Sequence, residues 1–245
     1  MKVVIFAGGF GSRISELSHL KPKPMIEIGG KPIIWHLMKS YEAQGFNEFV
    51  ICLGYKGHLI KEYFLNYYMY NSDLSIDVKN NKVDIHATNA TDFKITLIDT
   101  GLHTLTAGRL NRIKEHIDTD DFFLTYGDGL ADIDLKAELE FHRKHKKMVS
   151  MTIIQPEGRF GAIKYDENQM VTSFQEKPKG DGTWINGGFF ILNKRIFDYL
   201  PENSDEIMWE QEPLAKFTEM GELAAYKHTG FWKCMDSMKD KKVIE

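Results

Sequence analysis

The sequence has few cysteines and no long apolar segment. Its two cysteines, Cys52 and Cys234, do not form a CxxC pair, which argues against a disulfide framework and against a zinc site. No apolar run reaches the roughly 18 residues that a membrane-spanning helix needs. The first such run, Val3–Phe6, is too short for the core of a signal peptide. We therefore expect a cytoplasmic protein without a membrane partner.

A large excess of charge of one sign is also absent. The chain has 31 basic and 35 acidic side chains, so its formal net charge is −4. Such a charge does not draw nucleic acid or an anionic membrane to the whole surface, so any recognition of phosphate must be local. The remaining composition, 42% hydrophobic and 27% charged over 245 residues, is that of a globular protein with a substantial core.

The segment from Ala7 to Pro24 is the most informative part of the chain. It follows Lys2–Phe6 (KVVIF), an apolar, β-branched run typical of a strand buried on both faces of a parallel sheet. Its glycines and basic residues are Gly8, Gly9, Gly11, Arg13, Lys21 and Lys23. Glycines let backbone N–H groups approach an anion, and the flanking prolines hold Lys23 on a stiff, non-helical stretch. The segment predicts a cradle for a nucleoside triphosphate.

Two familiar phosphate-binding loops do not fit this segment. A dinucleotide fingerprint GxGxxG that begins at Gly9 needs a third glycine at position 14, which is Ile14. A P-loop needs Gly-Lys followed by serine or threonine, whereas the chain has Gly11-Ser12-Arg13. The alternative interpretation is a tight strand-to-helix turn with solvated charges. It does not account for the coincidence of glycines, an arginine and a proline-flanked lysine.

The apolar pattern predicts a βαβ unit near the N-terminus. It consists of the first strand, a helix over about 32–44 and a strand over 48–53. A right-handed crossover makes the two strands parallel, so that their carboxyl ends share the sheet edge where ligands bind. Further helices are expected at about 57–68, 107–116 and 135–146, and further strands at 148–154 and, in antiparallel arrangement, beyond 159. The expected fold is α/β: a Rossmann-like three-layer sandwich with a mostly parallel sheet, plus a small mixed or antiparallel β substrate lobe.

The stretch 74–97 alternates in polarity on either side of an Asn80-Asn81 turn. This pattern predicts a hairpin that leaves the body of the fold. The region 71–97 is our candidate for a contact between subunits of a homo-oligomer.

Two carboxylates are candidates for holding a metal ion. Phe122–Gly129 (FFLTYGDG) is expected to be a buried strand whose end places Asp128 between two glycines, at the same sheet edge as the first loop. Asp236 follows an aromatic, apolar run in GFWKCMD. Mg²⁺ prefers carboxylate and phosphate oxygens, so both residues are possible ligands. The alternatives are a turn residue for Asp128 and a helix cap for Asp236.

A second polar cluster lies in the C-terminal half, in the segments Arg159–Ala162, Gln175–Lys179 and Ile185–Phe190. Glu176 can accept hydrogen bonds from sugar hydroxyls, and Lys177 can hold a phosphate. Gly161, Gly187 and Gly188 allow a ligand to approach the backbone closely, and Asn186 has both a donor and an acceptor. The alternatives are a solvated turn and a hairpin loop.

In their order along the chain, AGGFGSR with KPKP, YGDG, GRFGAI, QEKPKGDG, INGGFF, WEQEPL and GFWKCMD resemble bacterial sugar-1-phosphate nucleotidylyltransferases. The resemblance spans nearly the whole chain and is strongest to the glucose-1-phosphate cytidylyltransferase branch. It implies transfer of a cytidylyl group from CTP to α-D-glucose 1-phosphate, giving CDP-glucose and pyrophosphate for the synthesis of surface-polysaccharide deoxysugars. Transfer with another nucleotide or acceptor, or a catalytically silent binding subunit, remain the alternatives.

The resemblance also implies one nucleotidyltransferase domain over 1–245, with a nucleotide-binding half at about 1–135 and a sugar-phosphate-binding half at about 136–245. Arg13 and Lys23 would be the catalytic residues, and Asp128 and Asp236 would coordinate Mg²⁺. The implied nucleotide-binding residues are Ala7, Gly8, Gly9, Gly11, Ser12, Arg13, Lys23, Thr104, Arg109, Gly127 and Asp128. The implied sugar-phosphate-binding residues are Gly161, Glu176, Lys177, Asn186 and Gly187. LHTLTAGR, around Thr104 and Arg109, fits the segment expected near the cytosine more loosely than the other motifs fit theirs.

Other conspicuous residues are expected to be structural. His142 and His145 share a helix face in a basic neighbourhood, which predicts a solvated helix end rather than a metal site. Trp209–Pro213 looks like a helix start whose acidic residues suit the helix dipole, although Glu210 could also meet the ligand.

Overall fold

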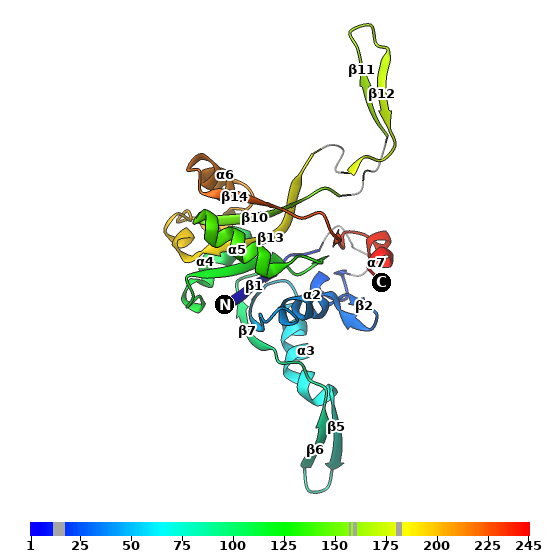
Figure 1. Cartoon of the computed structure of the whole chain (residues 1–245). Helices are drawn as coiled ribbons and strands as arrows, with labels where there is room; N and C mark the ends of the chain where they lie inside the picture. The colour runs from blue at the N-terminus through cyan, green and yellow to red at the C-terminus, as the bar shows by residue number, and fades with distance from the viewer. Residues whose placement is uncertain (12–17, 157, 159–160, 180–182) are drawn as a thin grey trace.

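The centre of the protein is a seven-stranded sheet with the strand order β14-β10-β13-β8-β1-β4-β7 (Figure 1). The computed structural model describes residues 1–11, 18–156, 158, 161–179 and 183–245. The strands of this sheet are β1 (Lys2–Ala7), β4 (Glu48–Leu53), β7 (Lys94–Asp99), β8 (Asp121–Tyr126), β10 (Val149–Ile154), β13 (Ile185–Asn193) and β14 (Leu223–Lys227). Neighbouring strands are parallel except where β13 runs antiparallel to β8 and β10. The expected mostly parallel α/β sheet is confirmed.

Strand β1 lies in the middle of the sheet because its apolar side chains alternate between two cores. Val3 and Ile5 pack into the core on one face, and Val4 and Phe6 into the core on the other. All four are at least 93% buried. Burial of each such side chain stabilises the fold by roughly 1.5–3 kcal/mol, so β1 is firmly held while the loop after it borders the ligand edge.

Helices cover both faces of the sheet and give the expected three layers. Within the described residues, the α-helices are α2 (Ile33–Glu42), α3 (Gly57–Tyr70), α4 (Thr106–Arg112), α5 (Leu135–His145), α6 (Glu212–Glu219) and α7 (Met238–Ile244). Apolar residues of α2, α3 and α5 pack on one face, and those of α4 and α6 on the other. No helix among the described residues is both long enough and apolar enough to cross a membrane.

Two short antiparallel ladders lie outside the main sheet and close to its carboxyl edge. One pairs β2 (Glu27–Ile28) with β3 (Lys31–Pro32), and the other pairs β9 (Gly129–Ala131) with β15 (Trp232–Cys234). In the second ladder Cys234 lies opposite Gly129, and the Met235 N–H donates to the Asp128 carbonyl oxygen at 2.9 Å. This ladder joins the ends of segments that are far apart in the sequence.

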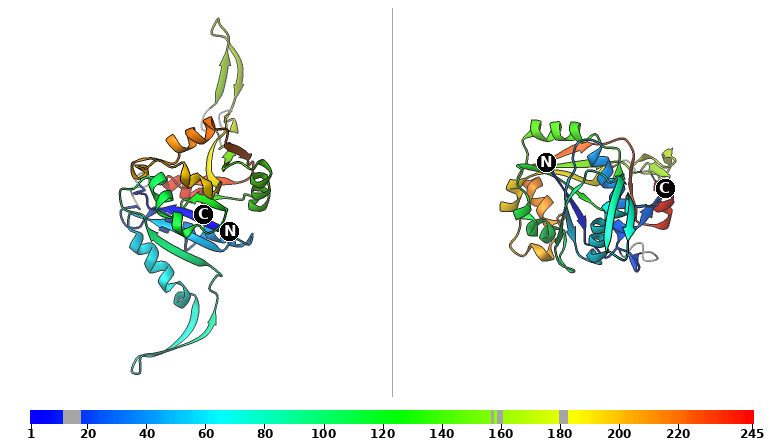
Figure 2. Two further views of the ribbon diagram at one scale, coloured as in Figure 1. Left: turned by 90° about the vertical axis from the view of Figure 1, so that its left-hand side faces the viewer. Right: turned by 90° about the horizontal axis from the view of Figure 1, so that it is seen from below.

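Two long two-stranded arms project from opposite ends of the body (Figures 1 and 2). One is formed by β5 (Ser72–Asp77) and β6 (Lys82–Thr88), and the other by β11 (Ala162–Tyr165) and β12 (Val171–Gln175). The first arm is the predicted hairpin, with Asn81 at φ +50° in its turn. The prediction that this hairpin continues to residue 97 is wrong, because 94–99 form β7 and pair in parallel with β4 at the edge of the main sheet.

Two other predicted boundaries differ from the structure. The strand expected over 122–129 ends at Tyr126, since the chain turns at Gly127 and Asp128 before β9 begins. The helix expected over 107–116 ends at Arg112 and is followed by a single 3-10 turn, Lys114–His116.

Candidate functional site

The glycine-rich loop begins where β1 ends and packs against Arg109. A β-carbon on Gly8 would lie 2.0 Å from Arg109 Nη1, so any larger residue there would displace the Arg109 guanidinium. Gly11 has φ +67° and lies beside Lys23, because a β-carbon on it would be 3.3 Å from that of Lys23. Ser12 and Arg13, which were predicted to bind the nucleotide, lie outside the described residues.

Arg109 holds three strand ends together beneath the cavity. Its guanidinium donates to Leu53 O at 2.9 Å, Thr100 Oγ1 at 2.7 Å and Gly8 O at 3.1 Å. The residue is only 4% exposed, and this burial lowers the pKa of its guanidinium. Arg109 therefore positions the backbone of the pocket, while its predicted contact with the base, like that of the buried Thr104, remains a prediction.

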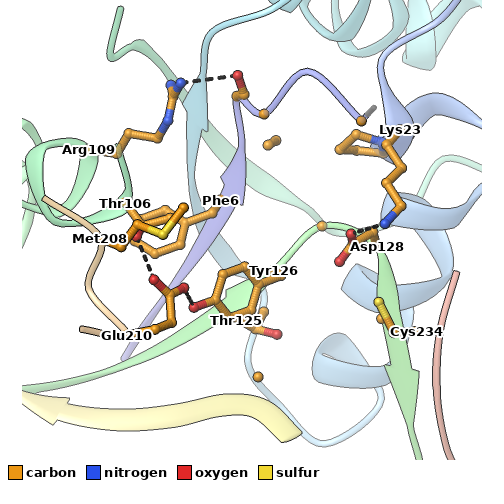
Figure 3. Close-up of a pocket in the computed structure, with 18 of the residues that line it drawn as sticks. Phe6, Lys23, Thr106, Arg109, Thr125, Tyr126, Asp128, Met208, Glu210 and Cys234 are labelled. Atoms are coloured by element: carbon orange, nitrogen blue, oxygen red, sulfur yellow. Dashed lines mark hydrogen bonds and ion pairs between the residues drawn. The ribbon is translucent and has the colours of Figure 1, made fainter. Parts of the chain in front are cut away.

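Lys23 is bound to two carboxylates at the opposite side of the cavity (Figure 3). Its Nζ donates to Asp128 Oδ2 at 2.6 Å and to Asp236 Oδ1 at 2.7 Å. Lys23 is 8% exposed and lies on a 3-10 turn, Lys23–Met25, that begins directly after Pro22. Burial alone would lower the pKa of the ammonium, but Asp128 and Asp236 raise it above its usual value. Lys23 is therefore a fixed positive charge at neutral pH.

Two structural features bring these residues together. The Gly127 N–H donates to Phe6 O at 2.9 Å, and a β-carbon on Gly127 would be 3.0 Å from the Pro24 ring, so Asp128 lies next to the Lys23 turn. The ladder between β9 and β15 then brings the segment of Asp236 to Asp128. Asp236 does not cap α7, since the Ser237 side chain accepts the cap hydrogen bond from Asp240 N–H.

The same corner contains the residues that suit a divalent cation. Ligand atoms of Asp128, Cys234 and Asp236 lie within 4.8 Å of one another. Burial and the neighbouring Asp128 raise the pKa of the Cys234 thiol to about 12, so this thiol is neutral at pH 7. Mg²⁺ selects oxygen ligands. The two carboxylates therefore fit a hard cation, whereas the neutral thiol adds little to its binding.

Between Arg109 and Lys23 lies a cavity of about 720 Å³, within the usual size of a pocket for a nucleotide or cofactor. Residues predicted for both substrates line it: Ala7, Gly8, Gly9, Gly11, Lys23, Thr104, Arg109, Gly127, Asp128, Asn186, Gly187 and Asp236. The Asn186 side chain accepts from the Gly188 N–H at 2.8 Å, and the Trp232 indole N–H donates to Gly187 O at 2.7 Å. The cavity thus brings segments from both halves of the chain together.

Three predicted sugar-binding residues lie outside the lining of this cavity. Gly161, Glu176 and Lys177 flank the β11–β12 arm, and a β-carbon on Gly161 would be 3.2 Å from Glu176 Oε2. The side chains of Glu176 and Lys177 are both more than 60% exposed and lie 3.7 Å apart. Their role in binding the sugar phosphate remains a prediction.

Sequence reasoning missed several residues that line the cavity: Phe10, Thr106, Tyr126, Met208 and Trp232. Tyr126 and Trp232 stand inside motifs that were recognised, TYGDG and GFWKCMD, so their positions beside Asp128 and Asp236 were a usable signal. Thr106 carried no such signal. It becomes part of the site because Glu210, distant in sequence, folds back onto the start of α4.

The prediction of a solvated helix end at His142 is wrong. His142 is 2% exposed, its Nδ1 lies 2.8 Å from Ser150 Oγ, and its Nε2 lies 3.5 Å from Asp121. Its hydrogen bond lowers the pKa of the Asp121 carboxyl. The basic residues around His142 suggested a solvated helix end, but the side of α5 that carries His142 packs on the sheet. His145 is exposed as expected.

The chain is similar in sequence and in structure to known proteins. A family model described as nucleotidyl transferase matches residues 2–234. Glucose-1-phosphate cytidylyltransferase of Salmonella typhi is 50% identical over 246 aligned residues, which cover 100% of this chain and 95% of that protein. The probable glucose-1-phosphate cytidylyltransferase of Bacillus subtilis is 45% identical, over 98% of this chain and 93% of its own. The crystal structure of HddC from Yersinia pseudotuberculosis superposes with a TM-score of 0.72 at 26% identity, covering 99% of this chain and 97% of that one.

Proposed function

The chain belongs to the nucleotidyl transferase family, and we propose that it transfers the cytidylyl group of CTP to α-D-glucose 1-phosphate, giving CDP-glucose and pyrophosphate. The observation that carries this proposal is the 50% identity over the full chain to a glucose-1-phosphate cytidylyltransferase. The cavity supports it, because Lys23 offers a positive charge and Asp128 with Asp236 can hold a cation, and both would offset the charge of two phosphate-bearing substrates.

The reaction does not need a general base. A sugar phosphate is largely ionised at neutral pH, so its oxygen is already nucleophilic and can attack the α-phosphorus of CTP in line with the departing pyrophosphate. What it needs is the positioning of two anions and the neutralisation of their charge. An ammonium has three N–H donors, and Lys23 uses two of them on carboxylates, so one remains for a phosphate oxygen. Lys23 can therefore bind a phosphate while it keeps its hydrogen bonds to both carboxylates.

Asp128 and Asp236 would hold a divalent cation, which supplies positive charge to the phosphates when it is bound. The carboxylates are the oxygen ligands that Mg²⁺ prefers, and Lys23 already holds the pair together. Arg13, Glu176 and Lys177 are proposed, on the resemblance of their motifs, to add charge and to position the sugar phosphate.

We also propose that the protein is a homo-oligomer and that the β5–β6 arm contacts a second copy. Leu74 pairs with Ile85, and Ile76 with Val83, across this ribbon, so one face of the ribbon is apolar. Ile76 is 61% exposed and Val83 45% exposed in the single chain. A free two-stranded ribbon is marginally stable in water, which favours a partner that covers this face.

The proposed activity is tested by incubating the purified protein with Mg²⁺, each of four nucleoside triphosphates and a panel of hexose 1-phosphates. Released pyrophosphate is quantified and the nucleotide sugar is identified by mass spectrometry. We expect the highest kcat/KM with CTP and glucose 1-phosphate. Faster turnover with another pair would replace the substrate assignment, and no pyrophosphate with any pair would favour a silent binding subunit.

A further inference from the structure

A carboxylate on the cavity wall away from the Lys23 cluster takes no part in the phosphate chemistry proposed above. Glu210 lies in the loop before α6, and its Oε2 accepts a hydrogen bond from Thr106 Oγ1 at 2.8 Å. Its Oε1 accepts from the Tyr126 hydroxyl. Figure 3 shows Glu210, Thr106 and Tyr126 together on one side of the view and Lys23 with Asp128 on the other.

The Glu210 carboxylate is held in place by groups that are themselves fixed. Thr106 Oγ1 accepts from the Trp209 N–H at 2.8 Å, so its single O–H is free to point at Glu210. Trp209 is fully buried, which anchors the loop that carries Glu210. The Tyr126 ring packs edge-on against Phe6, with ring centres 5.7 Å apart. Glu210 therefore needs little rearrangement to meet a ligand.

The Tyr126 ring also lies close to the backbone at Gly188. Gly188 has φ +78°, and a β-carbon on it would lie 3.0 Å from Tyr126 Cδ2. Tyr126 is thus held between β1 and the segment that also supplies Asn186 to the cavity. Glu210 thus lines the same cavity as residues of both predicted substrate-binding sets, among them Thr104 and Asn186.

Glu210 has hydrogen-bonding capacity that no described residue uses. A carboxylate can accept about four hydrogen bonds, and the described residues supply two of them to Glu210. The other carboxylates of the cavity lining, Asp128 and Asp236, are both ion-paired with Lys23. Within the part of the chain that the structure describes, Glu210 makes no ion pair.

The charge of Glu210 decides which part of a substrate can approach it. Phosphate groups are repelled by an uncompensated carboxylate. At the Lys23 corner, by contrast, the remaining ammonium N–H and a cation held by the two carboxylates would offset phosphate charge. Sugar hydroxyls are uncharged donors, and a hydrogen bond from a hydroxyl to a carboxylate is stronger than one between two neutral groups. The cavity thus has one side for phosphates and one for hydroxyls.

We propose that Glu210 is a specificity-determining residue that accepts a hydrogen bond from a sugar hydroxyl of the substrates. The hydroxyl belongs either to the ribose of CTP or to the hexose phosphate. The inference rests on the proposed function. It adds a contact that recognises the substrate and that the nucleotidyl transfer itself does not require.

The test compares deoxy substrates in the wild type, Glu210→Gln and Glu210→Leu. Glu210→Gln keeps one acceptor oxygen but loses the charge, and Glu210→Leu removes every acceptor. The analogues are 2′-deoxy-CTP, 3′-deoxy-CTP and the 2-, 3-, 4- and 6-deoxy forms of glucose 1-phosphate. In the wild type, kcat/KM should fall about ten- to a hundredfold for the analogue that lacks the contacted hydroxyl, the usual value of a hydrogen bond to a charged group.

That loss should shrink in Glu210→Gln and nearly vanish in Glu210→Leu, while the other analogues keep their relative rates. A change confined to a CTP analogue assigns the contact to the ribose, and one confined to a hexose analogue assigns it to the acceptor. If the kcat/KM of each deoxy analogue relative to the normal substrate is the same in all three proteins, the proposal is overturned, because Glu210 would then act only on the structure of the site.

Three controls keep this outcome clear. Glu212→Gln makes the same charge change two residues away, on an exposed side chain outside the cavity lining, and should leave every ratio unchanged. Thermal unfolding checks that each variant is folded, and Glu210→Gln carries the test if Glu210→Leu does not fold.

If the wild type releases no pyrophosphate, the proposed function fails. Calorimetric binding of CDP-glucose and of its deoxy forms then still tests the contact at Glu210.

Discussion

Lys23 combines two roles in one buried ammonium group. It forms ion pairs with both Asp128 and Asp236, which would otherwise repel each other across the cavity corner, and it can donate its remaining N–H to a proposed phosphate. Its charge does not depend on pH near neutrality, since the two carboxylates raise its pKa. The sequence pointed to Lys23 through its flanking prolines, but its two partners could only be found once the β9–β15 ladder was known.

We predict that Lys23→Ala lowers kcat for pyrophosphate release by more than about a hundredfold, the scale of losing a preorganised electrostatic group. Lys21→Ala is the matched control, because Lys21 is about half exposed and pairs only with Glu27 among the described residues. Circular dichroism and thermal unfolding establish that both variants are folded. Near-normal turnover by folded Lys23→Ala would remove Lys23 from the catalytic residues.

Glu138 is a buried carboxyl group on α5 that affects stability rather than catalysis. It is fully buried, its Oε1 accepts from Thr152 Oγ1 at 2.5 Å, and its Oε2 has no partner among the described residues. Burial raises the pKa of Glu138 from 4.5 to about 7. The folded state therefore favours the protonated form, and ionisation at higher pH acts against folding.

As the pH rises from 4.5, the unfolded chain ionises Glu138 before the folded protein does. The free energy of unfolding should therefore fall by up to about 3 kcal/mol between pH 4.5 and 7 and remain at this lower value above pH 7. Glu138→Gln should lose this contribution, so that its stability changes less than that of the wild type between pH 5 and pH 8. Urea unfolding at several pH values measures the difference, with exposed Glu140→Gln as the control. Parallel pH profiles for wild type and Glu138→Gln would contradict the prediction.

At the scale of elements, the body of the fold was predictable and the two arms were not. The strand over 48–53 was predicted with its observed bounds. A short apolar run between the end of a helix and a glycine has little room to form anything but a buried strand. The stretch 74–97 was assigned wholly to a hairpin, since alternation does not distinguish a free ribbon from the half-buried edge strand β7. The position of Glu176 beside an arm rather than in the cavity lining depends on tertiary arrangement, which local pattern does not encode.

The apolar face of the β5–β6 arm gives a prediction about assembly. Ile76→Lys with Val83→Lys should lower the molar mass measured by light scattering, because burying charge in an interface is costly. Ser75→Lys is the matched control, since Ser75 pairs with Asp84 on the opposite face of the ribbon. The melting temperature of the body should change little in either protein. An unchanged mass in the double variant would mean that the arm does not form the contact.

At the scale of the whole molecule, the cavity joins both halves of the chain through one sheet. Strand β8 pairs with β1 on one side and with β13 on the other, so residues before and after position 136 face the same space. Sequence reasoning anticipated the shared carboxyl edge of β1, β4 and β8. It anticipated antiparallel strands beyond 159 but placed them in a separate lobe, and so missed the insertion of β13 between β8 and β10, which brings Asn186 and Gly188 to the cavity.

A ligand that contacts both halves should stabilise the molecule as one unit. CTP with Mg²⁺ at about one hundred times its Kd adds roughly 2.7 kcal/mol to the free energy of unfolding. For a chain of this size we expect the Tm to rise by roughly 5–10 °C in a single transition. Removing the metal with EDTA should abolish most of this increase, and scanning calorimetry measures both effects. An increase of the same size without metal would argue against a cation at Asp128 and Asp236.

The ladder that pairs Gly129 with Cys234 has a consequence for the newly synthesised protein. A nascent chain that has left the ribosome as far as residue 230 already contains Lys23 and Asp128, yet it lacks β15 and Asp236. Its lysine then faces a single carboxylate, and the wall that includes Trp232 is missing. Competence for cation and nucleotide therefore requires β15, which is synthesised after every strand of the main sheet.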